Sequence, residues 1–333
     1  MNILITTSCS KGCSFCFAKD KNHQAEYMSL ANFQKLLDMV QRSTQRPNIK
    51  ILGGEPTQHP QFGDFIQELE TRNIAFSLIT NCLWPEGIQE ILDPVIAQGL
   101  MQSALVNAAE LQGRAVFENF QNNYDYLEKK SREIHSLRVS CGVTFHRDFS
   151  VAEEVAYVQW LLDNVVLHQL RISIDFLGEN TDDTMLIKNT VYGDKIQAIL
   201  KLCGTHLIPV SGDCVVYPCM FEDAHFARRI LPELAKTIQF TCADYSMPFD
   251  IYPDLSYFHC YPAHCFGGKN ILDFQTPEQA MEDMRIRKVA LMNMRSIPKD
   301  CQDCTWHKHS ECAGPCLGCS KLNEKSALLK VLD

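Results

Sequence analysis

The chain has 333 residues and a formal net charge of −9, and 46% of its residues are hydrophobic. This composition is typical of a folded globular protein, and the acidic balance argues against a nucleic-acid partner, because phosphate binding needs a basic surface. No run of about 18 apolar residues and no basic, signal-like N-terminus occurs, so we expect a cytoplasmic protein without a membrane partner.

Strands and helices are predicted to alternate from residue 1 to about residue 176. Helical spacing of apolar residues follows the N-cap candidate Ser29 and recurs in four later segments. The predicted strands are 2–7, 48–52, 74–80, 100–106, 137–145 and 170–176, and the later helices are 62–69, 85–96, 113–133 and 151–164. This alternation indicates βαβ units and a parallel sheet, with functional residues at the carboxyl ends of the strands.

Regular patterning stops after about residue 205, where the chain becomes rich in proline and cysteine. One helix, at residues 276–293, is predicted in this part. Two stretches, 213–219 and 254–260, each place an aspartate six residues before a cysteine in a hairpin-like pattern. A region with so little regular structure needs staples, and metal clusters would supply them.

The 16 cysteines are unevenly distributed, with three in residues 9–16 and five in residues 301–319. In a reducing cytosol, clustered thiols more often bind metal than form disulfides. The first group, Cys9, Cys13 and Cys16, follows the first predicted strand. Three thiolates could hold three irons of a [4Fe–4S] cluster and leave one iron open, whereas a zinc site would need a fourth ligand, for which His23 is the local candidate.

This cysteine loop, with aromatic Phe15 before its last thiol, resembles the signature of the radical S-adenosylmethionine (SAM) superfamily. The resemblance implies an α/β fold with a partial (β/α)6 TIM-like barrel. It also implies an open iron that chelates SAM, and reductive cleavage of SAM to a 5′-deoxyadenosyl radical. Under this hypothesis residues 1–205 are the radical SAM barrel and residues 206–333 a loop-rich, cysteine-rich auxiliary iron–sulfur domain.

Several residues at the ends of later strands resemble cofactor-binding positions of that superfamily. Gly53, Gly54 and Glu55 look like its GGE motif, in which the glycines allow close backbone approach and the carboxylate accepts from the SAM ammonium group. The other cofactor-binding candidates are Phe15, Asn81, Asn107 and Ser140. For the asparagines, the alternative interpretation is a turn residue.

The C-terminal cysteines Cys301, Cys304, Cys312, Cys316 and Cys319 are too closely spaced for core packing, and their chemistry alone fits zinc or iron–sulfur. They resemble the cysteine block of the SPASM subgroup, whose hairpin cysteines would be Cys242 and Cys260. The resemblance implies one or two auxiliary [4Fe–4S] clusters. Their implied ligands are Cys301, Cys304, Cys312 and Cys319 for the distal one, and Cys242, Cys260 and Cys316 for the proximal one, with Cys265, Cys219 or Cys214 as a fourth.

Two further residues are candidates for catalysis. His146 follows the fifth strand and could face substrate, and Asp175 ends the sixth strand and could transfer a proton. The alternatives are a solvated loop for His146 and a helix cap for Asp175.

The resemblance implies an oxidoreductase-like enzyme that abstracts hydrogen from its substrate. The expected substrate is a ribosomally made peptide or a protein side chain, modified by crosslinking, thioether formation, epimerisation or oxidation. Because Cys9 lies near the start, we expect that a separate leader-binding protein presents the peptide, that the peptide binds directly, or that the substrate is small. Flavodoxin or ferredoxin is expected to supply electrons. The alternatives are a dehydrogenase or epimerase of a small molecule such as a sugar, and a non-catalytic zinc or electron-transfer iron–sulfur protein.

Overall fold

The computed structural model describes residues 1–14, 16, 25–45, 47–108, 111, 113–146, 148–174, 188–212, 216–235, 249–259, 268–312 and 314. The chain forms two compact units. Unit 1 comprises residues 1–142, 248–260 and 267–284, and unit 2 comprises residues 143–247, 261–266 and 285–333. Neither unit begins or ends at residue 205. The division into a radical SAM barrel and an auxiliary domain after that residue stays a prediction.

Parallel strands form the sheet of unit 1, which confirms the predicted α/β class. Its first strands are β1 (Asn2–Thr6), β2 (Ile49–Gly53), β3 (Phe76–Thr80), β4 (Met101–Asn107) and β5 (Arg138–Phe145). Each pairs in parallel with the next one along the chain. Their carboxyl ends therefore lie at the same edge of the sheet.

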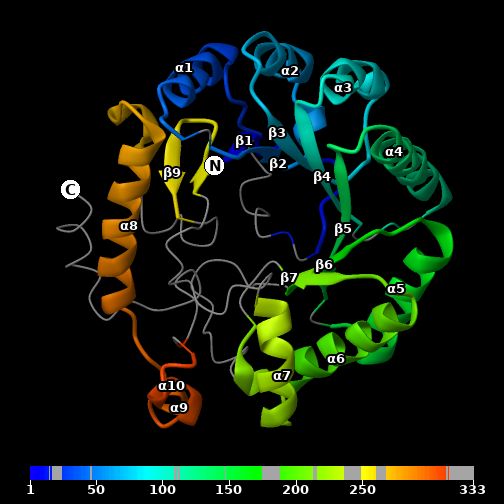
Figure 1. Ribbon diagram of the computed structural model, residues 1–333, viewed down its shortest axis with the longest axis vertical. Coiled ribbons are helices and arrows are strands. Elements are labelled where there is room, and N and C mark those ends of the chain that lie inside the picture. The colour runs from blue at the N-terminus through cyan, green and yellow to red at the C-terminus, as the bar shows by residue number, and fades with distance from the viewer. Residues whose placement is uncertain are drawn as a thin grey trace. The chain divides into compact units, whose positions relative to one another are not determined.

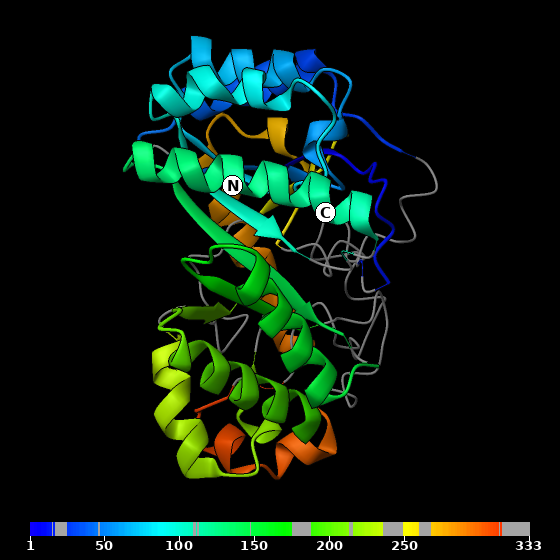
Figure 2. The same cartoon turned by 90° about the vertical axis from the view of Figure 1, so that its right-hand side faces the viewer.

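Four helices connect these strands and lie on the outside of the sheet in Figure 1. They are α1 (Leu30–Gln41), α2 (Phe62–Thr71), α3 (Ile88–Ala97) and α4 (Arg114–Glu133). The side chain of Ser29 accepts a hydrogen bond from Asn32 N, which confirms it as the N-cap of α1. Figure 2 shows α4 lying over β4 and β5.

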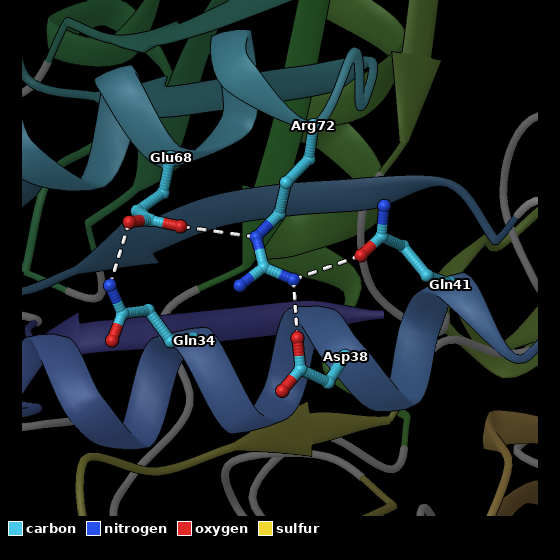
Figure 3. Close-up of polar contacts among 5 residues, drawn as sticks. All are labelled: Gln34, Asp38, Gln41, Glu68 and Arg72. Carbon is cyan, nitrogen blue, oxygen red and sulfur yellow. Dashed lines mark hydrogen bonds and ion pairs between the residues drawn. The ribbon is translucent and has the colours of Figure 1, made fainter.

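A polar network joins the exposed sides of α1 and α2 (Figure 3). Arg72 Nε lies 3.1 Å from Glu68 Oε2, and Arg72 Nη1 bonds both Asp38 and Gln41. Glu68 also accepts from Gln34 at 2.7 Å. This network fixes the register of two helices whose inner faces are buried.

Residues beyond 248 extend the same sheet on the other side of β1. Strand β8 (Asp250–Ile251) pairs in parallel with β1, and β9 (Ser256–Phe258) pairs antiparallel with β8. β10 (Lys269–Asn270) completes this edge. Leu255, at the turn of the hairpin, has a φ of +70°, a conformation in which glycine is usual.

Unit 2 contains the end of β5, then α5 (Val151–Asn164), β6 (Leu170–Ile174), α6 (Thr190–Thr205) and β7 (Val210–Gly212), which pairs in parallel with β6. It continues with η3 (Pro218–Met220), α7 (Ala224–Ala235), and the short helices α9 (Lys299–Gln302) and α10 (Thr305–Lys308). Helix α8 (Pro277–Asn293) matches the predicted 276–293 closely. Within the described ranges, no helix has the length and apolar character needed to cross a bilayer.

Candidate functional site

The carboxyl ends of β1, β2 and β3 bring three predicted motifs together in unit 1. Cys9 follows β1, Glu55 follows β2, and Asn81 follows β3. The N–H of Gly54 donates to Thr6 O at 2.8 Å, and the N–H of Glu55 donates to Ser8 O at 2.8 Å. The loop after β2 is therefore bonded directly to the segment that leads into the cysteines.

Gly53 and Gly54 have a specific steric reason to lack side chains. A Cβ atom on Gly54 would lie 2.2 Å from Ser8 O, and one on Gly53 would lie 2.3 Å from Thr6 O. The sequence predicts that these glycines let the backbone approach a ligand. In the structure they let it approach the backbone of the segment before the cysteines instead. These glycines hold the cysteine segment against the second strand.

The carboxylate of Glu55 is completely buried and accepts hydrogen bonds from three residues. Oε1 accepts from Thr57 N at 3.2 Å, Thr57 Oγ1 at 2.7 Å and Thr80 Oγ1 at 2.9 Å. Oε2 accepts from Asn81 N at 2.7 Å. Burial raises the pKa of Glu55, and these donors oppose that rise. A carboxylate has about four acceptor positions, two on each oxygen. Three of the bonds fall on Oε1 and one on Oε2, so Oε2 can still accept a hydrogen bond from a cationic donor.

Asn81 connects the third strand to the cysteine loop. Its Nδ2 donates to Cys9 Sγ at 3.6 Å, while its Oδ1 accepts from Leu83 N at 2.8 Å. Gln58 adds a second connection, because its side chain bonds both the N–H and the hydroxyl of Ser10 at 3.0 and 2.6 Å. Glu55 and Asn81, both predicted to bind the cofactor, thus lie close to the predicted metal ligand Cys9.

The cysteine loop fits an iron–sulfur cluster by the chemistry of its donors. Cys9, Cys13 and Cys16 are half-buried cysteines outside any disulfide. Burial raises the pKa of Cys9, the charge of Glu55 raises it further, and the N–H groups of Lys11 and Gly12 lower it. Such N–H donors to sulfur are typical of cluster ligands. Phe15 lies outside the described residues.

Asn107 ends β4, whereas Ser140 lies inside β5. Asn107 is exposed and pairs with Gly142, where a Cβ would meet Asn107 Oδ1 at 2.7 Å. Ser140 is half-buried and pairs with Leu105. The structure shows no contact of either with Cys9, so their cofactor-binding roles stay predictions.

His146 lies in unit 2 after β5, and its ring stacks on Phe149 with centroids 4.7 Å apart. Its backbone carbonyl accepts from Lys195 Nζ, whose ammonium lies 3.9 Å from Glu154 Oε2. Lys195 and Glu154 are buried, and sequence reasoning missed them, although Lys195 shares the apolar face of α6 with Ile196 and Ile199. The catalytic candidate Asp175 lies outside the described residues.

Four cysteines line one pocket in unit 2, namely Cys219, Cys301, Cys304 and Cys312. The pocket has about 400 Å³ of empty space, part of it open to solvent. Burial raises the pKa of Cys219 and of Cys312, and the charge of Cys304 raises both further. The other predicted auxiliary ligands lie outside the described residues: Cys214, Cys242, Cys260, Cys265, Cys316 and Cys319.

Three remaining cysteines, Cys82, Cys141 and Cys203, are buried, as expected for packing residues. In the described part of the chain, no three His, Cys, Asp or Glu side chains are grouped closely enough to hold a single metal ion.

Residues 3–106, which contain the cysteine loop, the GGE segment and the first four strands, match the family model described as the Radical SAM superfamily. The chain carries a radical SAM domain. This confirms the resemblance seen in the cysteine loop and places the protein with an enzyme superfamily whose cofactors are a [4Fe–4S] cluster and SAM.

Two curated relatives align with part of the chain. One is the tungsten-containing aldehyde ferredoxin oxidoreductase cofactor-modifying protein of Pyrococcus furiosus, 33% identical over 92 residues, or 27% of this chain and 26% of that protein. The other is the S-adenosylmethionine-dependent nucleotide dehydratase of Selenomonas ruminantium, 28% identical over 81 residues, or 24% of this chain and 29% of that protein. The match thus spans about a quarter of each relative.

Solved structures of Streptococcus suis SuiB share the fold. SuiB bound to S-adenosylmethionine superposes with a TM-score of 0.55 at 14% identity, over 92% of this chain and 70% of SuiB. SuiB bound to precursor peptide SuiA gives a TM-score of 0.57 at 15% identity, over 92% of this chain and 69% of SuiB. At this identity the similarity establishes the fold alone.

Proposed function

We propose that this radical SAM protein reductively cleaves SAM and uses the resulting radical to abstract hydrogen from a substrate. The observation that carries the proposal is that Asn81 bonds both Glu55 and Cys9, at the carboxyl ends of three neighbouring parallel strands. In parallel α/β sheets that edge is where ligands bind.

The chain's residues divide the work of holding the cofactors. Cys9, Cys13 and Cys16 would hold a [4Fe–4S] cluster through three of its irons and leave one iron open for SAM. When bound, the cluster would supply the electron that cleaves the sulfonium. Glu55 holds the strand ends in place through Thr57, Thr80 and Asn81, and its charge acts on Cys9.

The proposed substrate is a ribosomally made peptide or a protein side chain. Support comes from SuiB, a structural neighbour solved in complex with a precursor peptide. A small metabolite is the second candidate, because one curated relative is named a nucleotide dehydratase. We further propose a cytoplasmic location, a separate protein that presents the peptide, and a flavodoxin or ferredoxin reductant.

The proposal also includes an auxiliary iron–sulfur domain over residues 206–333. Its support is the group of four cysteines that lines the pocket of unit 2. A non-catalytic zinc protein has no use for an open three-cysteine loop beside a buried carboxylate, and this favours the enzyme.

The decisive experiment is anaerobic reconstitution with iron and sulfide, followed by reduction with dithionite in the presence of SAM. We expect 5′-deoxyadenosine from the natural protein and from the control Cys203→Ala, in which a buried packing thiol is removed. The variant Cys9→Ala/Cys13→Ala/Cys16→Ala should make none and still retain iron. A reconstituted protein that holds only zinc, or that forms no 5′-deoxyadenosine, would refute the proposal.

Substrate class can be tested separately. If a short open reading frame of precursor type lies beside this gene, its peptide should change mass when incubated with the reduced enzyme and SAM. If the peptide stays unchanged and a sugar or nucleotide is oxidised or epimerised instead, the small-molecule alternative holds.

A further inference from the structure

Cys219 lies far from the C-terminal cysteines in the sequence but shares their pocket. It belongs to η3, whereas Cys301 lies in α9 and Cys304 is the N-cap of α10. Cys312 follows α10, and the four sulfurs share one cavity walled by Tyr217, Pro218 and Trp306. An apolar wall of this kind limits the access of water to a metal site.

Lys188 ties Cys219 to the helix that carries Cys301. Its backbone N–H donates to Cys219 Sγ at 3.4 Å, and its ammonium lies 3.0 Å from Asp300 Oδ1, next to Cys301. The φ of Lys188 is +60°, a conformation that is costly for a residue with a side chain. The fold therefore accepts local strain at the residue that aims an N–H group at this sulfur.

Arg228 of α7 makes a second connection between the same two parts of the chain. Its guanidinium stacks on the Trp306 ring at 4.6 Å from the centroid, and its Nε lies 3.5 Å from Glu311 Oε2. Trp306 and Glu311 are close in sequence to Cys304 and Cys312. Two separate contacts thus hold the η3–α7 segment against the C-terminal cysteines.

The position of η3 itself is fixed by α6. A Cβ on Gly193 would lie 2.0 Å from Met220 O, so the absence of a side chain lets η3 approach the helix directly. Cys312 is also oriented, because Gly314 N donates to its sulfur at 3.4 Å. N–H donors therefore point at two of the four thiols, as is common for cluster ligands.

From this geometry we infer that Cys219, Cys301, Cys304 and Cys312 are the four thiolate ligands of one auxiliary iron–sulfur cluster. The inference rests on the proposed function for the kind of cluster and deepens it by naming a ligand set. It replaces Cys319 with Cys219 in the set that the resemblance implies. With four protein ligands the cluster has no open iron, so it would transfer electrons rather than bind substrate.

The inference requires a polynuclear cluster rather than one zinc ion. Four sulfurs around a single zinc lie about 3.8 Å apart, given Zn–S bonds near 2.3 Å and tetrahedral geometry. In a cubane each thiolate binds a different iron, so the sulfurs lie farther apart. The described side chains do not form a single-ion group, and zinc is one of the outcomes that the experiment distinguishes.

The experiment uses the full-length protein after anaerobic reconstitution, in the Cys9→Ala/Cys13→Ala/Cys16→Ala background, which lacks the SAM cluster. Iron, acid-labile sulfide and the EPR spectrum are measured before and after adding Cys219→Ala, Cys203→Ala or Cys319→Ala. We expect Cys219→Ala alone to lose about four irons per chain, or to change the EPR signal of the remaining cluster. Cys203→Ala and Cys319→Ala should leave this cluster in place.

A second measurement needs no substitution, so it does not depend on how a variant folds. Thiol alkylation of the reconstituted natural protein, read by mass spectrometry, should leave Cys219 and Cys301 protected until a chelator removes the iron. Alkylation of Cys219 while Cys301 stays protected would overturn the inference, as would cluster loss in Cys319→Ala but not in Cys219→Ala. Zinc without sulfide at this site would also overturn it. Protection of Cys219 without any 5′-deoxyadenosine would instead refute the proposed function alone.

Discussion

The side-chain amide of Asn81 donates a hydrogen bond to the sulfur of Cys9 across 3.6 Å. An N–H donor stabilises the more negative, reduced state of a cluster held by that sulfur. The backbone N–H of Asn81 also donates a hydrogen bond to the carboxylate of Glu55. One residue after β3 is therefore placed to influence both the metal ligand and the motif of β2.

Asn81→Asp should lower the reduction potential of the SAM cluster. The aspartate keeps an oxygen to accept from Leu83 N but loses the N–H and adds negative charge. We expect a shift on the order of 60 mV, equivalent to tenfold for a one-electron couple, in an EPR-monitored redox titration. Gln58→Ala is the control, because it removes bonds to Ser10 without touching the sulfur. Equal potentials in Asn81→Asp and the natural protein would contradict this prediction.

Gly54→Ala should prevent assembly of the N-terminal cluster. The added Cβ would lie 2.2 Å from Ser8 O, a backbone atom that cannot move without displacing the cysteine segment. The matched control is Gly63→Ala in α2, where the nearest atom is the flexible Ile91 side chain at 3.5 Å. That change should be neutral or stabilise by up to about 1 kcal/mol, through helix propensity. Iron content after reconstitution separates the two variants, and retained iron in Gly54→Ala would count against the steric argument.

Glu154 should make stability depend on pH. Burial raises its pKa to about 7, from an ordinary value of 4.5. The folded state therefore binds the proton more tightly than the unfolded state, so stability falls as pH rises from 4.5 through 7. Glu154→Gln should flatten this part of the profile, measured by thermal unfolding from about pH 5 to about pH 8. An unchanged slope would show that another group is responsible.

Lys195→Met should destabilise the protein by about 3 kcal/mol at a pH well above the pKa of Glu154, because there it leaves a buried carboxylate without its cation. In the double variant Glu154→Gln/Lys195→Met, the loss should be smaller than the sum of the single losses. Denaturant unfolding measures all three. Strict additivity would mean that the two side chains, 3.9 Å apart, do not interact.

Arg72→Ala should cost about 1 kcal/mol, the upper end for a surface network, because it removes contacts with Asp38, Gln41 and Glu68 together (Figure 3). Arg114→Ala serves as the comparison, since the Arg114 side chain is 91% exposed and pairs with Glu118 one helical turn away. Its loss should be close to zero. The difference should shrink in high salt, where surface charges are screened.

Short-range patterns predicted the elements of unit 1 well. The helix pattern after Ser29 and the strands ending before Glu55 and Asn81 depend on local periodicity and caps, which the sequence carries directly. The convergence of Cys9, Glu55 and Asn81 followed from the rule that parallel strands share a carboxyl edge.

Other features depend on contacts distant in the sequence and were not predicted. Helix α7 contains Pro232, which reads as a loop signal because proline interrupts helix bonding. The Lys195–Glu154 pair joins two helices, and charged residues are ordinarily assigned to the surface. The pairing of β8 with β1 joins residues about 250 positions apart, and no local pattern reports it.

That last pairing limits how the protein can be divided into parts. β1 is hydrogen-bonded on one side to β2 and on the other side to the segment of β8. On that second side, Asn2 N donates to Phe249 O at 2.9 Å and Asn2 Nδ2 donates to Asp250 Oδ1 at 2.7 Å. A fragment cut after residue 205 would expose the free edge of β1, and unpaired edges promote aggregation. The strand that leads to Cys9 is therefore completed by residues from the distant part of the chain, and the N-terminal half is not a separable module.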